Sequence, residues 1–161
     1  MTTRAEDGSI TVLVIGYVAI AAVLIAAGID VSKVFLAQRA LSSAADAAAV
    51  AAAEGVDTAR IYDGPDLRCG VPLSLDPLVA DTLARAHIAD SSPDLDRAFT
   101  SIDQPRTTVT GSTVTVALRG RVRVPFGHLL SWLGIRESDG SVVVTEQASA
   151  TSPVAGTPAS C

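Results

Sequence analysis

The side chains that could perform catalysis or bind a metal are few and far apart in this sequence. The two histidines, His87 and His128, have no second histidine or cysteine at the spacing of metal ligands. Aspartates are frequent in loop-like stretches, but none follows the D-x-[DN]-x-[DN]-G pattern of a calcium loop. We therefore expect no metal site.

Motifs for catalysis and for nucleotide binding are not found either. The sequence contains no GxSxG nucleophile turn and no GxGxxG or GxxxxGK[ST] phosphate loop. The net charge of −5 argues against a protein that grips nucleic acid, which requires clustered positive charge. We expect a protein that is not an enzyme and that binds no cofactor, nucleic acid or small-molecule substrate.

Three arginines form the one regular charged pattern. Arg119, Arg121 and Arg123 alternate with apolar residues in residues 113–126, which predicts a strand with one apolar and one charged face. Like charges on one strand face repel unless acidic groups meet them. The stripe is either a solvated face paired within the sheet with residues such as Glu146, or a docking surface for an acidic protein or anionic lipid headgroups.

The strongest structural signal is a membrane helix. Residues 10–29 carry no charge, and at about 1.5 Å per residue such a stretch spans roughly 30 Å, the thickness of a bilayer's hydrocarbon core. A buried core helix and a cleaved signal peptide are the alternatives. A signal peptide needs a basic segment before the apolar stretch, but here two acids accompany the one arginine, and the helical pattern continues beyond the stretch. We therefore expect the segment to be retained.

An alanine-rich amphipathic helix follows, up to Gly55, which we expect to act as its C-cap. If it joins the membrane helix, the two form one rod of about 70 Å. Its smooth apolar face would let another helix or a sheet approach closely. We consider two roles for this part of the helix: assembly with copies or partners, or the plainer role of a stalk or of a helix packed on the chain's own domain. The residues of the apolar face are Val34, Leu41, Ala45, Ala48 and Ala52.

Five residues in residues 8–54 follow a recognisable order: a glycine before the apolar helix, an acid that closes it, an aromatic, a basic residue and the aspartate of an Ala-Ala-Asp block. These residues are Gly8, Asp30, Phe35, Arg39 and Asp46. In this order the segment resembles the Tad (tight adherence, or Flp) pilus-assembly family, in particular its TadE-like and TadG-like proteins. The family implies a membrane-anchored or minor-pilin-like accessory component of a pilus or related secretion apparatus.

One position departs from the family pattern. Members cut by a prepilin peptidase usually carry a glutamate five residues after the cleavage glycine. Here the corresponding junction is Gly8-Ser9, and the fifth residue after Gly8 is Leu13. This disfavours both cleavage and bulk incorporation into a fibre, so the chain is closer to the TadG-like type.

The basic residues near the span do not indicate its orientation in the membrane by the positive-inside rule. Topology and partners are therefore also taken from the resemblance. It implies a cytoplasmic N-terminus and a C-terminal part outside the membrane. Besides the lipid bilayer, the partners it implies are TadE-like, TadB-like or TadC-like proteins or copies of the chain. A membrane-tethered exported module that recognises an envelope ligand through its sheet is the alternative.

The fold expected is α+β, with the membrane and alanine-rich helix followed by a small antiparallel-sheet domain and one or two short helices. The boundaries expected are residues 1–7 for a cytoplasmic tail, 8–54 for the helix, 55–150 for the exported domain and 151–161 for a flexible tail.

Within the domain, Asp76 and Pro77 predict the start of a helix that buries Val79, Leu83 and Ala86. Strands are expected over residues 97–102, 107–110, 113–126 and 141–150, with a hairpin turn at Gly111-Ser112 and a short apolar helix or turn over residues 126–135.

The two cysteines, Cys69 and Cys161, would lie outside the cytoplasm if the domain is exported, which favours a disulfide. Such a bond would add about 4–5 kcal/mol of stability in the chain-entropy treatment. Two free thiols are the alternative.

Overall fold

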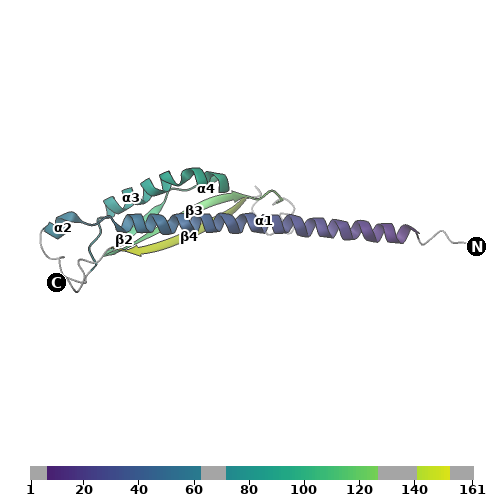
Figure 1. Ribbon diagram of the computed structural model, residues 1–161, viewed down its shortest axis with the longest axis horizontal. Coiled ribbons are helices and arrows are strands. Elements are labelled where there is room, and N and C mark those ends of the chain that lie inside the picture. The colour runs from purple at the N-terminus through teal and green to yellow at the C-terminus, as the bar shows by residue number, and fades with distance from the viewer. Residues whose placement is uncertain (1–6, 63–71, 127–140, 153–161) are drawn as a thin grey trace, which may run out of the picture.

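The computed structural model describes residues 7–62, 72–126 and 141–152. A long helix runs along the molecule, and an antiparallel sheet and short helices are folded on its C-terminal half (Figure 1). The elements in chain order are α1 (Asp7–Ala53), α2 (Thr58–Tyr62), α3 (Pro77–Asp90), α4 (Ser92–Ala98), β1 (Ser101–Ile102), β2 (Arg106–Thr110), β3 (Thr113–Arg123) and β4 (Ser141–Thr151). This arrangement confirms the α+β class.

The predicted rod is confirmed as α1, which is unbroken over 47 residues. It contains no proline, and alanine, the best helix former, is frequent in its C-terminal half. Gly16 and Gly28 interrupt neither its backbone nor any packing, since both have open space around them. At 1.5 Å per residue the helix is about 70 Å long.

Gly55 follows α1 but has a different role from the expected cap. Among the described residues, Gly111 is the one with positive φ, so Gly55 is not in the left-handed conformation. A Cβ atom at position 55 would lie 2.9 Å from the backbone nitrogen of Ala80 in α3. Gly55 is needed because α3 approaches the end of α1 closely.

β3 is the central strand of the four-stranded sheet. β4 pairs with it along its whole length on one edge. On the other edge, β2 pairs with the first half of β3 and β1 pairs with residues 120–121. The predicted hairpin turn is confirmed between β2 and β3, where Gly111 has a φ of 62°, as the first position of a type II′ turn requires.

α3 starts as the sequence predicts. Pro77 is its first residue, and the carboxylate of Asp76 accepts hydrogen bonds from the backbone N–H groups of Leu78 (2.8 Å) and Val79 (3.3 Å). These bonds satisfy two of the donors that a helix N-terminus leaves unpaired.

The buried face of α3 differs from the expected one. Ala80 and Ala84 are fully buried, whereas Val79 is 43% exposed and Ala86 is exposed. Small side chains face inward because α3 packs against the alanine face of α1, where larger side chains would hold the two helices apart.

The strand expected over residues 97–102 is wrong in its first part. Residues 92–98 form α4, which has Pro93 in its first turn, and β1 is limited to Ser101–Ile102. Phe99 ends α4 and is buried against Gly120 of β3, where a Cβ atom would lie 2.5 Å from the ring. Gly120 therefore leaves the space that this ring fills.

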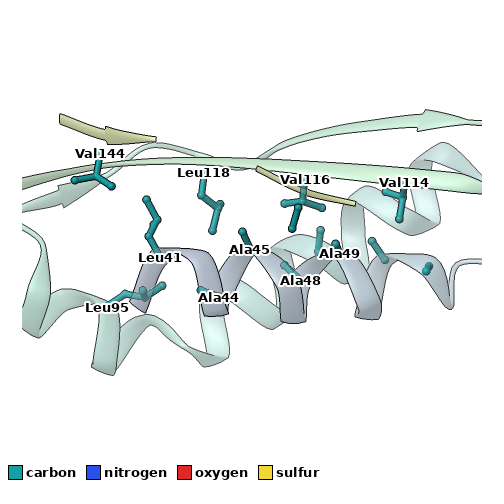
Figure 2. Close-up of a cluster of buried hydrophobic side chains, with 14 of the residues drawn as sticks. Leu41, Ala44, Ala45, Ala48, Ala49, Leu95, Val114, Val116, Leu118 and Val144 are labelled. Atoms are coloured by element: carbon teal, nitrogen blue, oxygen red, sulfur yellow. The ribbon is translucent and has the colours of Figure 1, made fainter. Parts of the chain in front are cut away.

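The core lies between α1 and one face of the sheet. Figure 2 shows Leu41, Ala45 and Ala49 of α1 beneath Val116 and Leu118 of β3. Alternation along β3 sends every second side chain into this layer. The domain thus has two layers, with α1, α3 and α4 on one face of the sheet.

Candidate assembly surfaces

The apolar face of α1 does not lie on the surface of the molecule. Leu41, Ala45, Ala48 and Ala52 are 0% exposed, and Val34 packs against the same core. The sheet, whose Val114, Val116 and Leu118 lie over this face in Figure 2, and α3 occupy the side of the helix that could have met a partner. The proposed assembly role of this face is therefore wrong, and its packing on the chain's own domain, the other role considered, is the one observed.

The opposite face of α1 is the exposed one. Five exposed residues follow each other at spacings of three or four, so they share one side of the helix. We call them the outer stripe: Phe35, Arg39, Ser43, Asp46 and Val50. Its two large apolar side chains, Phe35 and Val50, are 62% and 60% exposed.

A groove of about 440 Å³ runs beside the outer stripe and is bordered by Glu146 of β4. It contains both polar family residues of this half of the helix, Arg39 and Asp46. The sequence indicated that these two residues lie on the polar side of α1 but not that β4 forms the other wall. The groove combines a cation, two carboxylates and an exposed ring, which suits a polar protein contact.

Asp30, the third polar family residue, is buried, with an exposed fraction of 1%. Its Oδ1 accepts a hydrogen bond from the backbone N–H of Phe126 at 3.2 Å. Its Oδ2 is buried and has no hydrogen-bond partner in the part of the chain that the structure describes. Asp30 thus joins α1 to the chain just after β3, at the point where the apolar half of the helix ends.

The arginine stripe lies on the sheet face that points away from the helices. Arg119, Arg121 and Arg123 are all exposed, and Arg119 Nε lies 3.9 Å from Asp103 Oδ2. Pairing with Glu146 is wrong, because Glu146 stands opposite Leu118 in the register and so lies on the core side of the sheet. Exposed ion pairs of this kind contribute little, about 0–1 kcal/mol.

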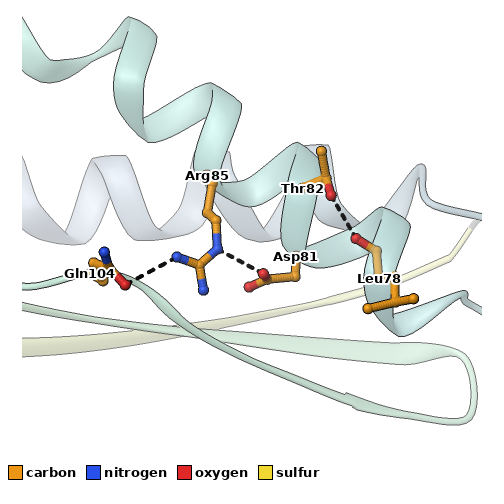
Figure 3. Close-up of polar contacts among 5 residues, drawn as sticks. All are labelled: Leu78, Asp81, Thr82, Arg85 and Gln104. Carbon is orange, nitrogen blue, oxygen red and sulfur yellow. Dashed lines mark hydrogen bonds and ion pairs between the residues drawn. The ribbon is translucent and has the colours of Figure 1, made fainter.

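Arg85 of α3 lines a third surface, a groove of about 590 Å³ that the sequence did not indicate. Arg85 Nε donates to Asp81 Oδ2 at 2.7 Å, and its Nη1 donates to Gln104 Oε1 at 3.3 Å (Figure 3). The hydrogen bond from Arg85 lowers the pKa of Asp81, and a smaller contribution comes from Thr107. The same bond raises the pKa of Arg85.

Several predicted residues cannot be placed. Cys69 and Cys161 lie outside the described residues, as do residues 127–135 of the expected apolar helix, so the disulfide stays a prediction. Gly8 and Ser9 belong to the first turn of α1. In residues 7–62, 72–126 and 141–152, no three His, Cys, Asp or Glu side chains come close enough to hold a metal ion.

Together these observations define an α+β protein built on one N-terminal helix, of which the first half is a candidate membrane span and the second half is a domain core. Residues 8–59 match the family model described as Tad, putative Flp pilus-assembly TadE/G-like. The match confirms the resemblance and supports a role in pilus assembly. It extends into α2, beyond the end of the alanine-rich helix. No curated protein and no solved structure matches the chain.

Proposed function

We propose that the chain is a membrane-anchored, non-catalytic accessory component, TadG-like in type, in the assembly of a Tad/Flp pilus or related secretion apparatus. Its N-terminus is cytoplasmic and its two-layer domain lies outside the membrane. The observation that carries the proposal is the division of α1 into two halves with different surroundings, within a segment that matches the pilus-assembly family.

The N-terminal half of α1 is apolar on all sides and has almost no contacts with the domain. Its large side chains between residues 10 and 25 are 52–73% exposed. Burying each such side chain is worth on the order of 1.5–3 kcal/mol, so water is an unfavourable environment for this half. A lipid bilayer would bury all sides at once, and residues 10–29 have the length that it needs.

The C-terminal half of the same helix is the centre of the domain core. No flexible linker separates anchor and domain, because α1 is continuous from Asp7 to Ala53. The domain therefore has a fixed orientation at the membrane surface. That fixed orientation favours an assembly role, since a tethered module that searches for an envelope ligand gains from a flexible connection.

The outer stripe is the surface that we assign to pilus partners, which are TadE-like, TadB-like or TadC-like proteins or other copies of the chain. It replaces the buried alanine face in this role. The family residues Arg39 and Asp46 lie on it, with exposed Phe35 and Val50 beside them. An aromatic and an arginine at the centre of a contact are typical of residues that dominate binding energy.

Site-specific photo-crosslinking in pilus-producing cells tests this proposal. Benzoylphenylalanine replaces Ser43, at the centre of the outer stripe, and Ala86 on the exposed side of α3 serves as the matched control. We expect a defined adduct with a pilus-assembly protein or a second copy from position 43 and none from position 86. Absence of any adduct from position 43, or the same adduct from both positions, would count against the proposal.

A further inference from the structure

A basic groove lies where α1, α4 and the end of β3 meet. Its volume is about 310 Å³, and its basic lining residues are Lys33 of α1, Arg97 of α4 and Arg123 of β3. Arg123 is the last residue of β3 and belongs to the outer face of the sheet, but it borders the groove at the edge of the strand. Leu36 and Val122 are among its apolar lining residues. The groove exists because β1 pairs with residues 120–121 only, so that among the described strands none covers the edge of β3 beyond them.

The three cations stand out in a chain of net charge −5. Among the described residues, none that lines the groove is acidic. The carboxylate of Asp94 lies 2.7 Å from Arg97 Nη1, but this pair is 78% and 86% exposed and is therefore screened by water. Arg97 keeps four further N–H donors, which leaves it able to bind an anion.

The groove also lies at a particular depth. Lys33 follows Ile29, the last residue of the expected span, by four positions, which is about 6 Å along the helix axis. The polar headgroup layer on each side of a bilayer is about 5–8 Å thick. If α1 crosses the membrane as proposed above, the Lys33 ammonium is at the level of the lipid phosphates.

The side chains next to Lys33 on the same face of α1 are apolar and point toward the bilayer core. Ile25, Ile29 and Lys33 are spaced by four residues, and the two isoleucines are 65% and 42% exposed. A cation at the top of an exposed apolar row matches a phospholipid, whose phosphate and acyl chain are arranged in the same order.

We propose that the basic groove binds one anionic phospholipid, with its headgroup phosphate among Lys33, Arg97 and Arg123 and an acyl chain along Ile29 and Ile25. The site rests on the proposed membrane anchoring of α1. It fixes the rotation of the helix in the bilayer, and therefore the direction in which the outer stripe faces.

Native mass spectrometry of the full chain in detergent micelles tests the site. The chain is titrated with phosphatidylglycerol, with phosphatidylcholine and with inorganic phosphate. The groove variant, K33Q/R97Q/R123Q, is compared with a control variant, R60Q/R106Q/R119Q, which loses the same charge elsewhere on the domain. Each cation near lipid phosphate is worth about fivefold in binding. We expect one tightly bound phosphatidylglycerol per chain, at least fivefold weaker binding in R97Q alone and loss of the lipid preference in the groove variant.

The control variant should keep the parent preference, and inorganic phosphate should not displace the lipid. Equal binding of the two lipids by the parent chain would overturn the proposal and favour an acidic protein surface as the occupant. Displacement of the lipid by inorganic phosphate would overturn the proposal in favour of a free-anion site. An equal loss of lipid preference in both variants would also overturn it, because the total charge of the domain would then explain the binding. Carbonate extraction of cell membranes reports separately on anchoring: a chain that stays in the membrane but lacks lipid preference refutes the groove site alone.

Discussion

The carboxylate of Asp30 in α1 accepts a hydrogen bond from the backbone N–H of Phe126, 96 residues later in the chain, at 3.2 Å. The bond lies where the exposed apolar half of the helix gives way to the domain core. It fastens the end of β3 to the helix at the level at which the domain would meet the membrane. Asp30 therefore joins the two layers of the domain at the end nearest the exposed apolar half of α1.

Replacing Asp30 with Ala should loosen this end of the sheet. The substitution leaves a half-buried N–H without an acceptor, which costs about 1–3 kcal/mol. Hydrogen exchange of residues 118–126 should become faster, while residues 113–117 keep their protection. Asp30→Asn retains an acceptor oxygen and should show less than half of this effect; equal acceleration in the two variants would mean that the hydrogen bond is not the cause.

Enlarging Ala48 to Leu should destabilise the domain. Ala48 is 0% exposed between α1 and the sheet, and added methylene groups in a packed core cost about 1–3 kcal/mol. The urea midpoint of the full chain in micelles should fall accordingly. Val50→Leu, two residues away at a position 60% exposed, is the matched control and should leave the midpoint unchanged. Normal stability of Ala48→Leu would contradict the burial of the alanine face.

Gly55→Ala should also lower stability, because the new Cβ would lie 2.9 Å from the backbone nitrogen of Ala80 and backbone cannot move aside as a side-chain tip can. We expect a loss of about 1–3 kcal/mol in the same urea titration. Gly28→Ala has open space around it and should be neutral or stabilising by up to about 1 kcal/mol. A neutral Gly55→Ala would show that α3 does not pack closely on the end of α1.

The Asp81–Arg85 pair should make a small, pH-dependent contribution to stability. The hydrogen bond from Arg85 lowers the pKa of Asp81 in the folded protein. A depressed carboxyl pKa stabilises the fold above the unfolded value of about 3.9, and the contribution disappears as pH falls through the lower folded value. Thermal melts should therefore show Asp81→Asn below the parent chain at pH 6, with a smaller difference at pH 2. A difference of the same size at both pH values would exclude ionisation of Asp81 as its source.

The sequence predicted those parts of the fold that local chemistry determines. The continuity of α1, the start of α3 at Asp76-Pro77 and the turn at Gly111-Ser112 depend on helix propensity, capping and the need for positive φ. The family segment was recognisable because its order of Gly, apolar span, Asp, Arg and Ala-Ala-Asp is itself local.

The parts that could not be predicted depend on contacts between distant segments. An alanine face fits a partner helix and the chain's own sheet equally well, so its pattern could not choose between them. The sequence suggested that Glu146 pairs with the arginine stripe, but the two lie on opposite faces of the sheet. Strand register decides which face a residue occupies, and the sequence did not give the register. Lys33, Arg97 and Arg123 carry no common motif, and only folding brings them to one groove.

Spin-label accessibility along α1 shows whether this helix is membrane anchor and domain core in one rod. Single cysteines at Ile15, Ile20, Ser43 and Val50, in a chain with Cys69 and Cys161 changed to Ser, carry the label in lipid vesicles. We expect collisions with oxygen to dominate at the first two positions and collisions with a water-soluble nickel complex at the last two. Nickel access at all four positions would show that α1 does not enter the bilayer, and oxygen-dominated signals as far as Val50 would show that its C-terminal half is not the core of a domain in water.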